Sequence, residues 1–182
     1  FDTNPTYGPD STALFDSTHN NTGTTALAIT GLDAIQVAMR SQTKYGSTHD
    51  ILGAANLPAF LIVPNELEGI ANRLIHPSGQ VWGQISADTD TDQDVTRFKD
   101  KMEIIVVDQF TNATDHFCLA DPDEVAGIGV AFLDGKEEPD LFIQGNENVG
   151  EMFSMDVQNI KVRQEFQTVV KDFRPFYRQD VA

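Results

Sequence analysis

The chain has 182 residues, of which 40% are hydrophobic and 22% are charged. These values are typical of a globular chain with one domain, or one domain and an appendage. The formal net charge of −16 disfavours a dedicated nucleic-acid-binding protein, because an acidic surface repels phosphate backbones. Cys118 is the single cysteine, which excludes a disulfide framework within the chain and fits a reducing compartment. Apolar runs such as residues 59–63 are too short to span a bilayer.

The C-terminal end differs from the rest of the chain in charge. Residues 159–182 hold five basic and three acidic residues, a net charge of +2, which leaves −18 for residues 1–158. A mildly basic strip of this kind could bind the acidic body of a second copy, head to tail. Docking of the tail on its own body is the simpler interpretation, and composition favours it.

Two helices are predicted in the first half of the chain. Residues 1–23 indicate an irregular arm with a small apolar anchor at residues 13–15. A helix is predicted from a Thr24 or Thr25 cap to about Lys44, with Gly46 ending it. A strand covered on both faces is predicted at residues 57–64, because the run is short and continuously apolar.

The second helix has the clearest amphipathic pattern in the chain. Asn65 and Glu68 have the spacing of a capping box, and apolar residues then recur at helical spacing up to Ile75. The dipeptide at residues 76–77 (HP) ends this helix.

A long acidic loop and a series of strands are predicted after the second helix. The loop covers residues 77–100. The predicted strands cover residues 102–107, 115–120, 127–133, 140–144 and 151–157, with turns at 121–124 and 134–136. Two helices followed by mainly antiparallel strands define an α+β fold.

The last predicted element is a strand of about ten residues at 160–171, amphipathic with one wet face and followed by an aromatic cluster. We expect Phe166, Val170 and Phe173 to be partly exposed.

The loop contains an aspartate repeat that superficially resembles a calcium-binding loop. Counted from Asp88, an EF-hand requires Gly at the sixth position and Glu at the twelfth, where this chain has Gln93 and Lys99. A solvated acidic loop is therefore the better interpretation of Asp88, Asp90, Asp92 and Asp94.

No catalytic, cofactor-binding or metal-binding residue is assigned from the sequence. His116 and Cys118 share one side of a predicted strand, but a cysteine nucleophile needs a neighbouring base and a third, orienting group, and this strand is apolar. Glu66 and Glu68 are explained by a helix start. Trp82 is either a contact residue or a packed anchor.

Five segments, in order over roughly residues 14–178, resemble the major head subunits of Mu-like phages. The matching segments are residues 60–68 (FLIVPNELE), 102–108 (MEIIVVD), 117–122 (FCLADP), 131–139 (AFLDGKEEP) and 160–166 (IKVRQEF) followed by 171–174 (KDFR). The resemblance implies the Hong Kong 97 capsid fold. In that fold residues 24–158 would be mostly the A domain, and residues 159–182 a strand returning to the P domain after the arm at 1–23.

The resemblance implies a structural subunit of an icosahedral shell that encloses DNA in a tailed phage or prophage. It would be found in the virion, and in the host cytoplasm before assembly, and when full length it would form pentameric and hexameric capsomers with itself. No enzyme activity, cofactor, metal, membrane, small-molecule substrate or specific nucleic-acid contact is expected.

The family has an arm, a hairpin loop and a spine helix before this region. We therefore expect a C-terminal portion of a longer capsid protein, with the acidic loop near the capsomer axis. The alternatives are a small hydrolase using His116 and Cys118 or a metal at residues 88–94, and a tail or adaptor module of a virion.

Overall fold

The computed structural model describes residues 4–76, 98–143 and 158–181. The chain forms two compact units, which we call the body (residues 1–127 and 170–182) and the ribbon (residues 128–169). The boundary between A and P domains that is expected at residues 158–159 stays a prediction. Among the described residues, no helix is long and apolar enough to cross a membrane.

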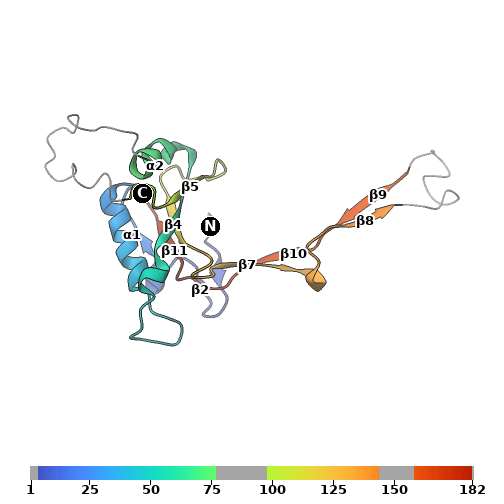
Figure 1. The fold of residues 1–182 in the computed structure, drawn as a ribbon, viewed down its shortest axis with the longest axis horizontal. Helices are drawn as coiled ribbons and strands as arrows, with labels where there is room; N and C mark the ends of the chain where they lie inside the picture. The colour runs from blue at the N-terminus through green and yellow to red at the C-terminus, as the bar shows by residue number, and fades with distance from the viewer. Residues whose placement is uncertain (1–3, 77–97, 144–157, 182) are drawn as a thin grey trace. The chain divides into compact units, whose positions relative to one another are not determined.

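The body is built around a five-stranded mixed sheet (Figure 1) with the strand order β3-β11-β6-β4-β5. The strands are β3 (Thr22–Gly23), β11 (Phe176–Gln179), β6 (His116–Ala120), β4 (Pro58–Val63) and β5 (Glu103–Val106). The β4–β5 and β3–β11 pairs are parallel, and β6 is antiparallel to both of its neighbours. The predicted strands at 57–64, 102–107 and 115–120 are confirmed. However, two residues of the expected C-terminal aromatic cluster, Phe176 and Tyr177, belong to a further strand, β11, which lies inside the sheet and was not predicted.

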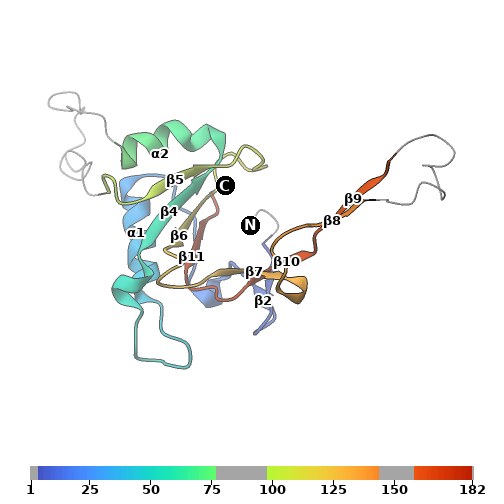
Figure 2. The same ribbon diagram turned by 45° about the vertical axis from the view of Figure 1, so that its right-hand side comes forward.

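One face of this sheet is covered by α1 (Ile29–Ser41) and α2 (Glu68–Ile75), as Figure 2 shows. Ile35 of α1 and Ile75 of α2 are fully buried in one cluster with Leu61 and Cys118 of the sheet. The connection from β4 through α2 to β5 is the kind of crossover that parallel neighbours require.

The predicted starts of both helices are wrong. The backbone N–H of Thr25 donates to Oε1 of Gln179 at 2.8 Å, so this segment stays outside the helix and α1 begins at Ile29. At the other helix, residues Asn65–Leu67 form the 3₁₀ turn η3, which Pro64 begins by accepting from the N–H of Leu67. The structure gives α2 no side-chain cap hydrogen bond, so the capping box is not formed.

Of the predicted C-terminal ends of the two helices, the end of α1 is wrong and the end of α2 is confirmed. α1 stops at Ser41, before the expected Lys44, because Gln42 leaves the helix and its side-chain amide donates to the carbonyl of His19 at 2.7 Å. Gly46 lies in the following loop with φ +74°. The 3₁₀ turn η2 (Gly53–Asn56) then leads to β4. The end of α2 at His76 is confirmed.

The other face of the sheet is covered by the N-terminal segment. Leu14 and Phe15 are buried in a second cluster with Ile62, Phe117 and Phe176, which confirms the apolar anchor. The segment itself is not irregular throughout. It contains β1 (Thr6–Tyr7), β2 (Thr12–Ala13), the 3₁₀ turn η1 (Ser17–His19) and β3. β1 and β2 pair antiparallel as a small hairpin.

The ribbon consists of two two-stranded ladders. β7 (Ile128–Phe132) pairs with β10 (Phe166–Val170), and β8 (Asp140–Ile143) pairs antiparallel with β9 (Ile160–Arg163). The 3₁₀ turn η4 (Leu133–Gly135) follows β7. The strands predicted at 127–133 and 140–144 are thus confirmed over their described residues, whereas the one predicted at 151–157 lies outside them.

The single long strand predicted at 160–171 is wrong, because it is divided into β9 and β10. The interruption lies beside the turn η4, which separates β7 from β8, the strands that pair with β10 and β9. Asp134 and Gly135 adopt left-handed φ values of 55° and 71°, and the Gln164 side-chain amide donates to the carbonyl of Glu137 at 2.8 Å. Phe166 is exposed, and Val170 and Phe173 are partly buried, as expected.

Candidate assembly surface

The β8–β9 ladder separates apolar and charged side chains onto opposite faces. Leu141 lies opposite Val162, and Ile143 lies opposite Ile160. Because cross-strand partners share a face and side chains alternate along a strand, these four residues form one face, which we call the apolar face. Their exposed fractions are 54–64%. Four branched apolar side chains therefore stand uncovered on one side of this ladder.

The opposite face of the same ladder is charged. Asp140 lies opposite Arg163, with 3.8 Å between the carboxylate and guanidinium groups, and Phe142 lies opposite Lys161. The ammonium of Lys161 and the guanidinium of Arg163 both lie 5.8 Å from the centroid of the Phe142 ring. Cations at this distance are attracted to the ring face, which keeps Phe142 associated with water-exposed groups.

The β7–β10 ladder also exposes apolar side chains. Ile128, Val130 and Phe132 alternate along β7 and so share one face. The ring of Phe132 lies 6.4 Å from the ring of Phe166 on β10. Ile128, Val130 and Phe166 are all exposed, so this ladder also has an uncovered apolar side.

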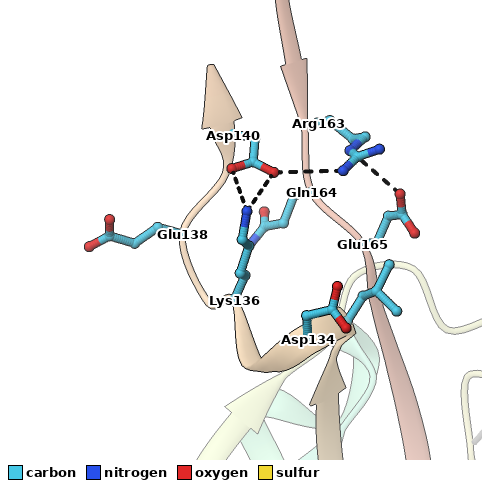
Figure 3. A pocket seen from close by; sticks show the side chains of 8 residues that line it. Asp134, Lys136, Glu138, Asp140, Arg163, Gln164 and Glu165 are labelled. Atoms are coloured by element: carbon cyan, nitrogen blue, oxygen red, sulfur yellow. Dashed lines mark hydrogen bonds and ion pairs between the residues drawn. The ribbon is translucent and has the colours of Figure 1, made fainter. Parts of the chain in front are cut away.

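A shallow hollow at the junction of the two ladders is lined by charged side chains (Figure 3). Lys136 donates to both carboxylate oxygens of Asp140, at 3.2 and 3.3 Å, and Arg163 lies 3.6 Å from Glu165. Exposed ion pairs of this kind contribute little to stability. The hollow is lined by neither a histidine nor a hydroxyl or thiol nucleophile, so its residues do not form a Ser–His or Cys–His arrangement for acyl transfer.

The ribbon cannot bury its own apolar residues. Of the fifteen large hydrophobic side chains that are exposed in the described residues, ten lie between residues 128 and 169. Neither hydrophobic cluster includes a residue of this segment. A two-stranded ribbon is marginally stable by itself in water, and a concentrated apolar surface marks a binding site for another polypeptide.

The structure places His116 and Cys118 where no substrate can reach their side chains. Both side chains are fully buried on β6. Burial raises the pKa of the Cys118 thiol to about 12, and it lowers the pKa of His116. A thiol that stays protonated and has no path to a substrate is a packing residue, so the hydrolase interpretation is not favoured.

The remaining sequence candidates gain no support as ligands. Within residues 4–76, 98–143 and 158–181, no group of three or more His, Cys, Asp or Glu side chains could hold a metal ion. Residues 88–94 and Trp82 lie outside the described residues. Glu66 and Glu68 are exposed at the start of η3 and α2, as a helix-start role predicts.

The sequence pattern predicted the strands of this surface but missed their pairing. The available signal was the alternation in β9, where Ile160 and Val162 alternate with Lys161 and Arg163. A second apolar run at residues 141–143 supplies its partner. Alternation shows which side chains share a face, but it does not show which strands are neighbours.

An uncovered apolar ribbon is a property of a protein that binds other polypeptides. A family model described as phage capsid protein matches residues 1–179, and the chain therefore belongs to this phage capsid protein family. It is thus a structural capsid protein of a bacteriophage virion, a class whose members assemble into oligomeric shells. No curated protein and no solved structure matches the chain.

Proposed function

We propose that the chain is a shell-forming subunit of a tailed-phage or prophage head with the Hong Kong 97 fold, related to the major head subunits of Mu-like phages. When full length, it forms pentameric and hexameric capsomers that enclose DNA, after a stage in the host cytoplasm. The uncovered apolar side of the ribbon carries this proposal, because a subunit in a shell can bury such a surface against its neighbours.

The domain assignment belongs to the same proposal and rests on the segments that resemble the family. Residues 24–158 are mostly the A domain, and residues 159–182 return to the P domain. The net charge of −16 supports an enclosing role, because an acidic wall repels packed DNA instead of binding it.

The proposal is tested by the assembly of the purified full-length protein. Light scattering after gel filtration and negative-stain electron microscopy, over a range of protein and salt concentrations, should show five-fold or six-fold rings or closed shells. A full-length protein that stays monomeric at every concentration, in a sample verified as folded by circular dichroism, would contradict it.

The hydrolase alternative is tested at Cys118. We expect iodoacetamide to leave the native thiol unmodified and to label it only as fast as the protein unfolds, because the thiol is buried and its pKa is about 12. Cys118→Ser is the matched variant for an assay with activated esters. Rapid labelling of the native protein, or ester hydrolysis that Cys118→Ser abolishes, would support the enzyme instead.

A further inference from the structure

A buried histidine of the N-terminal segment, His19, lies between two hydrogen-bond acceptors. Its Nε2 atom is 2.7 Å from a carboxylate oxygen of Asp10, and its Nδ1 atom is 3.1 Å from the carbonyl oxygen of Leu14. A carbonyl and an ionised carboxylate can only accept, whereas a neutral imidazole has a single N–H. Both contacts are therefore hydrogen bonds only when one additional proton is present, either on His19 or on Asp10.

The surroundings of Asp10 place this proton on the ring. The other carboxylate oxygen of Asp10 accepts from the backbone N–H of Thr12 at 3.0 Å. The hydrogen bond from His19, together with the one from Thr12, lowers the pKa of Asp10, so this carboxyl group is ionised at neutral pH. His19 is only 5% exposed, and burial by itself disfavours a charged ring. The adjacent carboxylate offsets that cost.

Aromatic side chains hold the ring of His19 in this position. It stacks on the ring of Phe173, with 3.9 Å between the centroids and 12° between the planes. Tyr7 contacts both rings edge-on, and its hydroxyl donates to the carbonyl of Lys171 at 3.2 Å. An aromatic face attracts a cation, so this stack is compatible with a charged imidazole.

The other charged groups around the ring do not oppose its charge. The carboxylate of Asp16, which caps η1, is a second negative group near His19. The guanidinium of Arg174 lies 4.7 Å from the centroid of Phe173, but it is paired with the carboxylate of Asp172 at 2.8 Å.

We propose that His19 carries a proton on both ring nitrogens in the folded chain, and that this proton fastens the N-terminal segment to the rest of the body. A histidine in water loses its second proton at about pH 6.5. If the docked segment keeps a proton that the released segment loses, raising the pH above that value favours release. Release uncovers the face of the sheet that Leu14 and Phe15 cover. The inference is independent of the proposed function, because every group involved lies within one copy.

Hydrogen exchange of the 182-residue chain, followed by NMR, measures this release. The amides of Leu14 and Phe15 are the reporters, because they donate to the carbonyl of Pro5 and to the side chain of Asn4 within the segment. The amides of β6 inside the sheet are the reference. After correction for the intrinsic exchange rate, we expect the protection of the reporters relative to the reference to fall at least fivefold between about pH 6 and pH 8.5. A constant ratio would overturn the proposal.

Two substitutions that each remove one negative charge separate the proton from general electrostatics. In Asp10→Asn the side-chain amide can donate to a neutral Nε2, so the contact no longer needs the additional proton. The protection ratio of this variant should change less than twofold over the same interval. Asp16→Asn keeps a capping oxygen and does not bond to the ring, so it should retain the native pH dependence. Retained pH dependence in Asp10→Asn, or its loss in Asp16→Asn, would contradict the assignment.

Nitrogen-15 NMR of the histidine rings detects the proton directly. At about pH 7.5 both ring nitrogens of His19 should have the chemical shifts of protonated nitrogens, and in the urea-unfolded chain one of them should not. His19→Phe identifies these signals by removing them, and its ring can still stack on Phe173. This variant should also open at least fivefold more than the native chain at about pH 6. An unprotonated His19 nitrogen in the folded chain at about pH 7.5 would refute the proposal.

Discussion

At the level of single residues, close packing on both faces of the central sheet limits which substitutions its buried positions tolerate. Leu61 and Cys118 are fully buried beneath the helices, and Phe176 is almost fully buried beneath the N-terminal segment. Interiors packed at this density do not absorb an added methyl group without a shift of their neighbours. Substitutions that add or remove volume or charge at these positions should therefore change stability more than surface changes do.

Gly127 illustrates this limit. A Cβ atom at this position would lie 2.5 Å from Cζ of Phe176 and 2.7 Å from Cγ of Pro175. We expect Gly127→Ala to lower the free energy of unfolding by about 1–3 kcal/mol, the usual cost of overpacking. Gly69→Ala in α2 is the control, because nothing lies within 4 Å of its added Cβ, and it should stabilise by about 0.5–1 kcal/mol. Equal effects of the two changes in urea unfolding would refute the packing argument.

His116 gives the body a dependence on pH. Burial lowers its folded pKa below the ordinary 6.5, so the unfolded chain binds the proton more readily. The stability that the neutral side chain contributes is present above about pH 6.5 and is lost as the pH falls towards the lowered folded value.

The measurement is urea unfolding at a series of pH values from 7.5 to 5. His116→Phe retains a ring and removes the titrating group, so we expect it to lose less stability over this interval than the native chain. The exposed His49 provides the control, and His49→Ala should follow the native curve. Parallel curves for the native chain and His116→Phe would contradict the assignment.

At the level of elements, a buried ion pair connects the start of β6 to β11. Asp115 is 4% exposed, and its carboxylate accepts from Arg178 at 2.7 Å and from the backbone N–H of Val181 at 3.0 Å. The Asn112 side chain donates to the same carboxylate at 3.0 Å. A buried charge with this many donors stabilises the fold chiefly because removing one partner leaves the others unpaired.

We expect Asp115→Ala to cost about 3–5 kcal/mol of unfolding free energy, since it leaves a largely buried guanidinium without its nearest carboxylate. Asp180 approaches the same guanidinium at 3.4 Å but is exposed, so Asp180→Ala should cost no more than about 1 kcal/mol. Denaturant unfolding of both variants makes the comparison. Similar losses of unfolding free energy for the two variants would show that burial does not make the Asp115 ion pair more stabilising than the exposed one.

The elements also show what sequence patterns can and cannot predict. The apolar run of β4 and the amphipathic repeat of α2 are local signals, and both were predicted within one or two residues at their ends, apart from the first turn of α2. The start of α1 depends on Gln179, which lies 154 residues from Thr25, so no local pattern could show it. The interior position of β11 could not be predicted for the same reason, because its neighbours β3 and β6 are distant in sequence.

The assembly surface was predictable to a similar degree. The alternation of Ile160 and Val162 with charged residues indicated a strand with one wet face. The structure confirms a strand at residues 160–163, but all four of its residues are exposed, so both of its faces are wet. The division between β9 and β10 depends on the turn at residues 133–135 on the opposite side of the ribbon. The apolar strand indicated that Cys118 is a packing residue, and this side chain is fully buried in the structure. The burial of His116 was not predicted.

At the level of the whole molecule, the division into body and ribbon predicts independent folding of the body. Both hydrophobic clusters are built from residues outside 128–169. The chain also leaves and re-enters the body at adjacent points, because the N–H of Lys171 donates to the carbonyl of Gly127 at 2.8 Å. A two-residue Asn-Gly turn can therefore replace residues 128–169 without stretching the backbone.

We expect this deletion to keep a cooperative unfolding transition and the native near-ultraviolet circular dichroism of the body. Its free energy of unfolding should lie within about 1 kcal/mol of that of the intact chain, since the removed residues belong to neither core. The same deletion in the full-length protein should abolish the assembly that the proposed function assigns to the uncovered apolar side of the ribbon. The intact chain with Val162→Asp is the control, because it places a charge on the apolar face while keeping the ribbon. An unfolded deletion variant would show that the body depends on the ribbon for its stability, and a deletion variant that still associates like the intact chain would place the contact on the body.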